Sequence, residues 1–268
     1  MIMTTKTNLS ADWADNRIQE NEHISDNVDR DLLLHYIYKS ILNGNHSCPF
    51  DNSMEKCLDI GYSSGYWMME MATDFPNCQF YGIDIDPNVP ELVYPKNCFF
   101  GQGDYLKALP YEDNSFDVVH LRSLSTLGNS TQISFLLSEV YRVTKKGGYV
   151  QYEFFGPNSD PLLSPILGKL MKIYSNNTMF NCKMDRMLVE SGFVNVTDNK
   201  VVSLPLVRGS MVGEFSLAAL KNFIETMDVR TKSKLDLRGD EDNLQYLLER
   251  ECKQYNVYIN VFSGYGQK

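Results

Sequence analysis

The sequence predicts an α/β protein with a doubly wound, mostly parallel seven-stranded sheet, an antiparallel edge strand and a helical cap. Three observations support this fold class. Short apolar segments alternate with segments of helical periodicity between about residues 56 and 154. The first apolar segment leads into a turn with a glycine at each end, and a helix-like run follows that turn. The first two predicted strands also carry an acid near their ends. Strands that alternate with helices at this spacing form parallel sheets covered on both faces.

Each predicted element follows from its local pattern. Apolar residues recur at helical spacing over 28–42, which indicates an amphipathic helix before the sheet. Strands are expected at about 56–61, 79–84, 98–101, 117–121, 149–154 and 193–203. Helices are expected at about 64–74, 131–144, 161–175 and 183–191. The helix at 131–144 is expected to stop at Lys145-Lys146-Gly147-Gly148, because basic residues followed by glycines suit the end of a helix.

The C-terminal part of the chain has a different organisation. Residues 204–252 have the pattern of helices with charged faces, and the alternating segment at 255–262 suits an edge strand. A helical insertion at this point would lie over the carboxyl edge of the sheet, where open α/β sheets bind ligands. We therefore expect one domain over 21–268, with a helical cap at about 205–254 and a flexible N-terminus over 1–20.

Composition excludes several classes of protein. The 268 residues are 43% hydrophobic and 22% charged, which is ordinary for a globular domain. The net charge is −9 and basic residues occur at most in pairs before the C-terminal third, so extended nucleic-acid binding is disfavoured. The six cysteines lack the spacing of metal ligands, and no metal is expected. Without a signal-like or membrane-spanning segment, we expect a soluble cytoplasmic protein, with the nucleus as an alternative.

Three acids follow successive predicted strands. Asp59 is near the end of the first strand, Asp84 ends the second, and Asp104 follows the third. A carboxylate at the tip of the second strand can accept two hydrogen bonds from a ribose diol. The turn between Gly61 and Gly65 precedes a helix whose first N–H groups would face the ligand. Together these features favour an adenosine-type cofactor.

Four segments in order now identify a family resemblance. The segments CLDIGYSSG, GIDIDP, GQGDYLKALPYEDNSFDVVHLRSL and LLSEVYRVTKKGGYVQYEF resemble the motif set of class I S-adenosylmethionine-dependent methyltransferases. Within this family the chain resembles a fungal group that includes secondary-metabolite methyltransferases and the velvet-complex type regulator of secondary metabolism. The resemblance covers the chain from about Asn21 onward. It implies S-adenosylmethionine as cofactor. The apolar and aromatic residues of the predicted cap favour a small-molecule methyl acceptor over a nucleic acid, and no membrane partner is expected.

The resemblance implies roles for the residues that match its motifs. Asp59 and the turn from Gly61 to Gly65, including Tyr62 and Ser63, would hold the methionine end of the cofactor. Asp84 would accept the ribose hydroxyls and Ile85 would pack on the adenine. Asp104 would receive the adenine amino group, and Tyr105 would supply a backbone N–H to the ring.

The ends of the fourth and fifth strands supply the remaining candidates. His120, Leu121 and Arg122 would lie under the sulfonium and face the acceptor. His120 is a candidate catalytic base, although a histidine at a strand end is often a hydrogen-bonded structural residue. Glu153 could deprotonate or orient the acceptor, or could cap the following loop. Arg122 could pair with a carboxylate of the cofactor or acceptor, or with a neighbouring acid.

One position departs from the family pattern. The first turn usually reads Gly-x-Gly-x-Gly, but Ser63 occupies the middle glycine here. If this residue has a positive φ, its side chain adds strain of about 1 kcal/mol. This departure keeps open a non-catalytic regulator that binds a protein partner. A nicotinamide-dependent oxidoreductase is a second alternative, but it normally needs G-x-G-x-x-G, which GYSSGYW lacks.

Overall fold

The fold is described from a computed structural model of the chain. It describes residues 30–87, 93–123, 130–157, 166–170, 183–197, 200–206, 211–225, 229–235, 244–255 and 257–268. The predicted flexible segment 1–20 lies outside these residues, as does most of the helix predicted at 161–175. Residues 166–170 of that predicted helix are helical.

The strands of the described chain form one seven-stranded sheet in the order β3-β2-β1-β4-β5-β7-β6. Their bounds are Lys56–Ile60 for β1, Gln79–Asp84 for β2, Cys98–Gln102 for β3, Phe116–Arg122 for β4, Thr144–Pro157 for β5, Lys200–Pro205 for β6 and Tyr258–Gln267 for β7. The helices are 30–42, Tyr66–Asp74 (α2), Ser130–Val143 (α3), Met184–Glu190 (α5), Met211–Glu225 (α6), Val229–Ser233 (α7) and Leu244–Tyr255 (α8).

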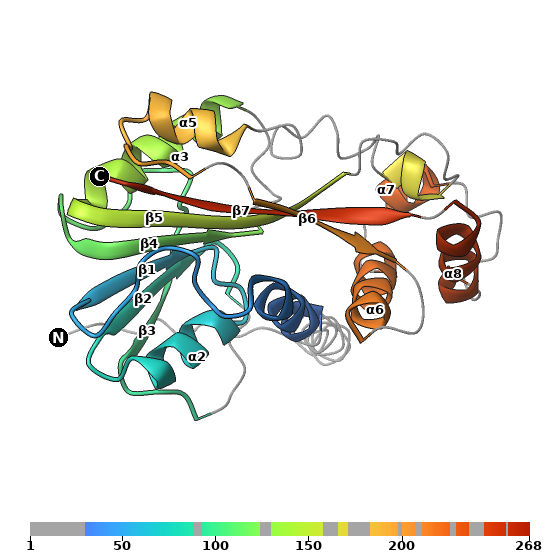
Figure 1. Cartoon of the computed structure of the whole chain (residues 1–268), viewed down its shortest axis with the longest axis horizontal. Helices are drawn as coiled ribbons and strands as arrows, with labels where there is room; N and C mark the ends of the chain where they lie inside the picture. Colours follow the sequence, from blue (N-terminus) through green and yellow to red (C-terminus); the bar gives the residue numbers. More distant parts are fainter. Residues whose placement is uncertain are drawn as a thin grey trace, which may run out of the picture.

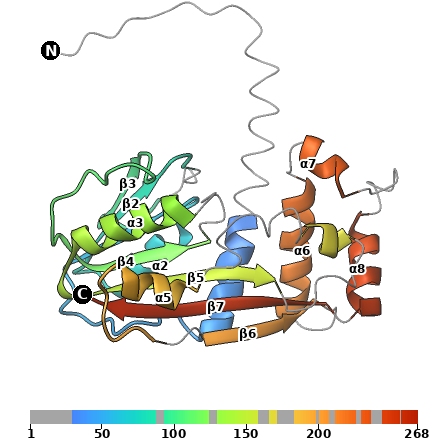
Figure 2. The same ribbon diagram turned by 90° about the horizontal axis from the view of Figure 1, so that it is seen from above.

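The arrangement of layers confirms the predicted doubly wound class. Strands β1 to β5 pair in parallel, with β1 at the centre between β2 and β4. The helix 30–42 and α2 lie on one face of the sheet, and α3 and α5 lie on the other (Figure 1). The view turned by 90° shows the same separation of α3 and α5 from the helix 30–42 (Figure 2). This winding leaves the carboxyl ends of β1, β2 and β4 together at one edge.

The closing strand is not the outermost one. The alternating segment was expected at the edge, but β7 pairs antiparallel with β5 on one side and with β6 on the other. The edge position is therefore taken by β6, which is shorter than the strand predicted at 193–203. Within that predicted range, Val194 makes only an isolated bridge with Gln267.

The segment Lys145–Gly148 also differs from expectation. It was expected to end a helix, but α3 ends at Val143 and β5 begins at Thr144. The register with β4 shifts between Phe116 and Val118, so the extra residues form an irregularity inside the strand pair. Gly147 supplies the left-handed backbone there, with φ of 81°, and its N–H donates to the carbonyl of Lys268. The glycines thus serve a strand irregularity and not a helix end.

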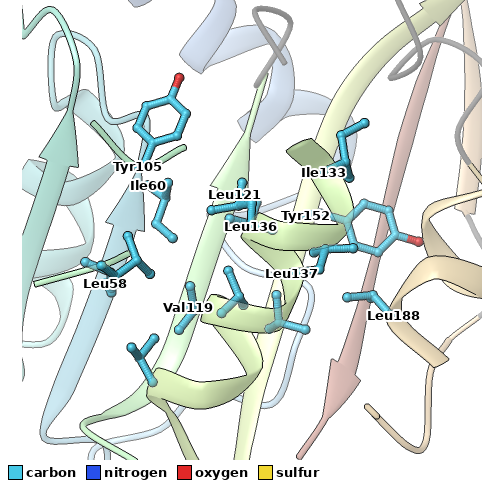
Figure 3. Close-up of a cluster of buried hydrophobic side chains, with 14 of the residues drawn as sticks. Leu58, Ile60, Tyr105, Val119, Leu121, Ile133, Leu136, Leu137, Tyr152 and Leu188 are labelled. Carbon is cyan, nitrogen blue, oxygen red and sulfur yellow. The ribbon is translucent and has the colours of Figure 1, made fainter. Parts of the chain in front are cut away.

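Two hydrophobic clusters hold the helices to the two faces of the sheet. One cluster joins β1, β4 and β5 to α3 and α5; Figure 3 shows Leu58, Val119, Leu137 and Leu188 converging in it. The other joins the sheet to α2 and includes Trp67. Burial of each such side chain contributes about 1.5–3 kcal/mol relative to exposure. The strand ends are therefore fixed by well-packed layers on both sides.

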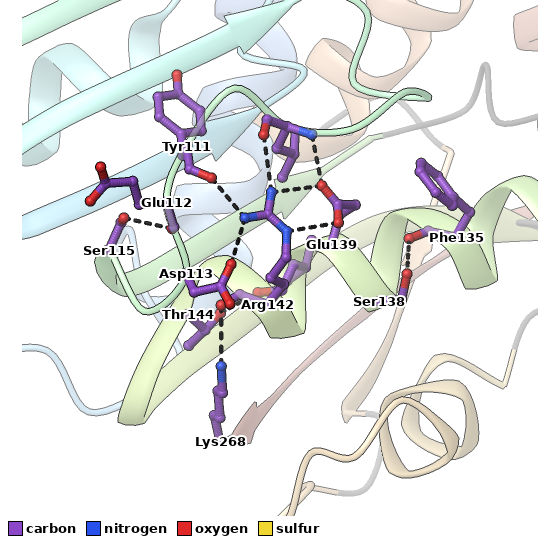
Figure 4. Close-up of polar contacts among 12 residues, drawn as sticks. Tyr111, Glu112, Asp113, Ser115, Phe135, Ser138, Glu139, Arg142, Thr144 and Lys268 are labelled. Carbon is purple, nitrogen blue, oxygen red and sulfur yellow. Dashed lines mark hydrogen bonds and ion pairs between the residues drawn. The ribbon is translucent and has the colours of Figure 1, made fainter.

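Polar contacts fix the C-terminal end of α3. Arg142 donates to Glu139, to Asp113 and to the carbonyl oxygens of Leu109 and Tyr111 (Figure 4). These contacts tie the loop that precedes β4 to the helix that follows it. Arg142 therefore helps to set where β4 starts, and hence where its carboxyl end lies.

Helices α6 and α7 fall within the predicted cap at 205–254, and α8 ends one residue beyond it. α6 and α8 share a hydrophobic cluster with residues from 166–170 and with Leu206 and Leu235. In a separate cluster, Phe215 of α6 packs with Ile37 and Tyr38 of the helix 30–42. The cap segment thus reaches the sheet edge through the helix 30–42, and its role as a cap stays a prediction. Within the described residues, none of the helices is long and apolar enough to cross a bilayer.

Candidate functional site

The predicted acids meet at the carboxyl edge of the central strands. Asp59 lies in β1 and pairs in register with Gly82 of β2 on one side and with His120 of β4 on the other. Asp84 is the last residue of β2. Both residues are almost entirely buried, at 3% and 8% exposure. Because neighbouring parallel strands end together, these acids border a single site.

The turn after β1 has left-handed backbone at three positions. Gly61, Ser63 and Gly65 have φ of 74°, 52° and 73°. A Cβ at Gly65 would lie 2.6 Å from the Phe100 ring, so glycine is required there for space as well as for conformation. Ser63 carries the strain that the sequence anticipated for this position. The turn therefore keeps the backbone shape of a glycine turn, with a side chain at its centre.

Asp84 is held by backbone donors on both of its oxygens. The N–H of Ser63 donates to Oδ2 at 2.7 Å, and the N–H of Asp86 donates to Oδ1 at 2.9 Å. Burial raises the pKa of Asp84 above its usual range, while these two hydrogen bonds act in the opposite direction. Each carboxylate oxygen can accept a further hydrogen bond. The predicted ribose-binding acid is thus fixed in orientation before any ligand arrives.

The positions predicted to surround the adenine differ in exposure. Ile85 is 41% exposed beside the buried Asp84, so it offers an apolar surface that a ring could cover. Asp104 accepts from the N–H of Leu106 at 3.0 Å and lies 3.2 Å from Lys107 Nζ, which lower its pKa. The side chain of Tyr105 is buried in the core, which agrees with a role for its backbone only. Tyr62 is also buried, and it packs at 5.2 Å from Phe100.

His120 lies between two carboxylates. Its Nδ1 is 2.8 Å from Asp59 Oδ1, and its Nε2 is 2.7 Å from Glu153 Oε2. The ring also stacks on Trp67 of α2, with 3.7 Å between centroids. All three members of the triad are at most 3% exposed. The structure thus joins three predicted site residues into one buried triad.

Counting protons defines the state of this triad. A neutral imidazole has one N–H and can donate to only one of the two carboxylates. Burial opposes the charged form, but the two carboxylates outweigh burial and raise the pKa of His120. A doubly protonated His120 donates to both acids and satisfies the geometry. Since both nitrogens are then engaged, the arrangement favours an orienting role for His120 over the predicted catalytic one.

The other predicted residues at the ends of β4 and β5 face different surroundings. Leu121 points to the opposite side of the sheet from His120 and is 3% exposed in the core under α3. Its side chain therefore does not face an acceptor, contrary to expectation, because side chains alternate along a strand. Glu153 is 2% exposed, so it meets the acceptor only through a change in structure.

Arg122 is contacted by the helix 30–42. Its Nη1 lies 3.1 Å from His35 Nδ1, and its guanidinium lies 5.5 Å from the centre of the Tyr38 ring. Burial and the charge of Arg122 lower the pKa of His35 to about 4, so His35 is neutral near pH 7 and accepts through Nδ1. His35 Nε2 then faces Glu70 Oε2 at 3.0 Å. Both of these described contacts of Arg122 are thus with neutral groups.

The helix 30–42 also supplies a residue that the sequence patterns missed. Asp31 Oδ2 accepts hydrogen bonds from the hydroxyls of Ser63 and Ser64. Nearer the C-terminal end of this helix, Tyr38 is hydrogen-bonded to Ser123 at 2.7 Å. The sequence spacing of Asp31, His35 and Tyr38 could have indicated that they share one face of the helix, but not which residues they contact. Helix 30–42 therefore borders the site that β1, β2 and β4 form.

These features fit an adenosine-type cofactor with an amino-acid end. The oriented carboxylate of Asp84 lies beside the exposed side chain of Ile85. Both adjoin the turn after β1, in which the N–H of Ser63 donates to Asp84. The helix α2 begins directly after Gly65, which as the N-cap residue makes no side-chain hydrogen bond to the helix. The positive end of a helix dipole favours a carboxylate. The donor set thus suits both ends of such a cofactor.

Comparison with known proteins agrees with this geometry. Residues 57–148 match the family model described as a methyltransferase domain. The secondary metabolism regulator laeA of Coprinopsis cinerea is 32% identical over 99 residues, which are 37% of this chain and 24% of that protein. The N-methyltransferase verN of Clonostachys rogersoniana is 28% identical over 171 residues, which are 60% and 58% of the two chains. This chain thus spans less than two thirds of the length of either relative.

Solved structures show the same fold. The phosphoethanolamine N-methyltransferase 2 of Haemonchus contortus, in complex with S-adenosyl-L-methionine, superposes with a TM-score of 0.50 and 18% identity. The match covers 87% of this chain and 56% of that one. The segment that matches the family model, residues 57–148, runs from β1 to the start of β5. It contains the turn from Gly61 to Gly65 and the buried acids Asp59 and Asp84. Residues 57–148 therefore resemble a methyltransferase domain, and the chain has the fold of that S-adenosyl-L-methionine-bound methyltransferase.

Proposed function

We propose that the protein transfers a methyl group from S-adenosylmethionine to a small-molecule acceptor. The observation that carries the proposal is the preoriented Asp84 beside the turn from Gly61 to Gly65, with Asp59 buried on the adjacent strand. The family of the matched domain uses this cofactor. The names of the relatives include an N-methyltransferase and a regulator of secondary metabolism, so a secondary metabolite is the acceptor class we favour.

The chain's own residues would bind and orient the reactants. Asp84 would accept the ribose hydroxyls, Ile85 would cover the adenine, and Asp104 and the Tyr105 backbone would complete the adenine site. Asp59 and the glycine turn would hold the methionine end, with Arg122 near its carboxylate. When bound, the cofactor supplies a methyl group that its sulfonium already activates, so the protein contributes alignment and exclusion of water. His120 would keep Asp59 and Glu153 in place.

Calorimetry with S-adenosylhomocysteine tests the cofactor site, and NAD(H) serves as the comparison ligand. We expect binding of the former only. Asp84→Asn should weaken binding by about 1.5–3 kcal/mol, the value of hydrogen bonds to a charged group. Asp86→Asn is the matched control, because Asp86 contacts Asp84 through its backbone N–H. No heat at millimolar ligand would remove the enzyme proposal.

The acceptor is sought by incubating the protein with extracts and a cofactor labelled on its methyl group. Transfer of label to a small molecule supports the proposal, and transfer to protein alone contradicts the acceptor class. The second candidate function is a regulator that binds a protein partner. It is favoured by the strained Ser63 in the turn and by the regulator among the relatives. Cofactor binding without any label transfer would favour this candidate.

A further inference from the structure

Asp31 connects the helix 30–42 to the turn after β1. One of its oxygens, Oδ2, accepts hydrogen bonds from the hydroxyls of Ser63 and Ser64, the latter at 2.8 Å. The other oxygen, Oδ1, accepts from the guanidinium of Arg30 at 3.1 and 3.3 Å. Asp31 is therefore oriented from both sides, although it lies outside the segment that matches the methyltransferase domain.

Ser63 joins Asp31 to the acid predicted to bind ribose. Its hydroxyl donates to Asp31, and its backbone N–H donates to Asp84 Oδ2 at 2.7 Å. A single residue thus bridges carboxylates from two distant segments. A displacement of Ser63 would move or remove a donor that fixes the orientation of Asp84.

The backbone of Ser63 depends on this support. Its φ of 52° is in the left-handed region, which is strained for a non-glycine residue. A hydrogen bond from a neutral hydroxyl to a carboxylate is charge-assisted and can offset that strain. A glycine at this position would be free of the strain but would have no hydroxyl for Asp31. The serine and Asp31 therefore act as a matched pair.

Other residues of the helix 30–42 fix the position of Asp31 next to the turn after β1. Asp31, His35 and Tyr38 are spaced by four and three residues, so they share one face of the helix. His35 contacts Arg122 and Tyr38 contacts Ser123, both at the end of β4. The helix is thus anchored at the β4 end, and Asp31 reaches the turn after β1 from a fixed position.

We propose that Asp31 is a positioning residue of the cofactor site, which acts through Ser63 to keep Asp84 oriented for the ribose. This inference rests on the proposed function, because it assigns Asp84 to the cofactor. It gives Ser63 a purpose in a turn where the family pattern has glycine. On this account the serine is a docking point for the helix 30–42 and not a sign of a decayed site.

A double-mutant cycle tests the proposal in the full chain. Dissociation constants for S-adenosylhomocysteine are measured by calorimetry for wild type, Asp31→Ala, Ser63→Ala and the double variant. Each single change should weaken binding about tenfold, which corresponds to losing about 1.4 kcal/mol. The double variant should bind about as well as either single variant, because the same link is already broken. Independent roles would instead give a loss of about a hundredfold.

Ser53→Ala is the matched control. The Ser53 hydroxyl also donates to a carboxylate oxygen, Oδ1 of Asp51, but at an exposed position before β1, so Ser53→Ala should change affinity less than about threefold. Asp31→Asn serves as a second variant that keeps the size of the side chain, and the same loss is expected. Thermal unfolding of each variant checks that it is folded.

The outcomes separate this inference from the proposed function. If wild type binds and Asp31→Ala or Asp31→Asn binds equally well, the positioning role is wrong and the cofactor site stands. Losses that add in the double variant also overturn the route through Ser63. If wild type does not bind S-adenosylhomocysteine, the proposed function fails and this inference fails with it.

Discussion

Replacing His120 with glutamine should destabilise the protein strongly. The side chains of His120, Asp59 and Glu153 are 1%, 4% and 1% exposed, so the triad is shielded from water. Glutamine removes the positive charge and leaves two carboxylates without compensation. Breaking a buried ion pair in this way costs about 3–5 kcal/mol, a large part of the 5–15 kcal/mol that stabilises a typical domain. The stacking of the ring on Trp67 is lost as well.

The pH dependence gives a second observable. The pKa of His120 is raised in the folded state, so its contribution to stability is complete below the unfolded value of about 6.5. That contribution is lost as the pH rises through the raised folded pKa. Burial also raises the pKa values of the nearby Tyr38 and Cys48, which keeps those groups neutral over the same range. The stability difference between wild type and His120→Gln should therefore shrink at alkaline pH.

Urea unfolding monitored by circular dichroism measures both effects, at intervals from about pH 6 to about pH 10. His46→Gln is the control, because His46 lies in a partly exposed loop and contacts the carbonyl of Cys48. We expect the control to change the free energy of unfolding by less than about 1 kcal/mol. A cost for His120→Gln that is equally small, or one that grows with pH, would refute the charged triad.

The remaining predictions concern the turn, Arg122 and the cap. Ser63→Gly should leave cofactor affinity and stability within about 1 kcal/mol of wild type, because relief of strain offsets the lost hydroxyl and the entropy of glycine; restored binding in the variant alone would indicate a decayed site. Arg122→Gln should weaken the binding of S-adenosylhomocysteine by about 1.5–3 kcal/mol. Binding of 5′-methylthioadenosine, which lacks the carboxylate, should be unchanged, and equal losses of affinity for both ligands would contradict a carboxylate contact. A shortened chain that joins Leu204 to Tyr255 through a glycine-rich linker should bind S-adenosylhomocysteine and lose transfer to its acceptor. Failure of this chain to fold would mean that 205–254 is core.

The fold could be predicted because its signals are local. The ends of β1 and β2, with Asp59 and Asp84 at or next to them, and the turn at Gly65 follow from short apolar runs and glycines. The position of β7 could not be predicted in this way, because an alternating pattern does not tell which strands flank it. The glycines after Lys146 were misassigned because a helix end and a strand irregularity both require a left-handed residue.

The sequence predicted several residues of the candidate site, but it did not predict which of them contact one another. His120 and Glu153 were selected for their places at strand ends, which are set by the sheet. Whether a histidine there faces a ligand or two acids depends on which strands are adjacent and on Trp67 above it. Asp31 was missed because its partners lie more than thirty residues away in the sequence. Long-range pairing of this kind leaves no periodic pattern to recognise.

The connection between β6 and β7 has a consequence for how such proteins diversify. The two strands are paired from Lys200 with Ser263 to Pro205 with Tyr258, so helices α6, α7 and α8 are enclosed in a loop whose ends are already fixed. Closing a longer loop costs little, about 0.6 kcal/mol for each doubling of length. Insertions, deletions or wholesale exchange of that loop can therefore occur during evolution while the strand register, and with it the triad and the turn, is inherited unchanged.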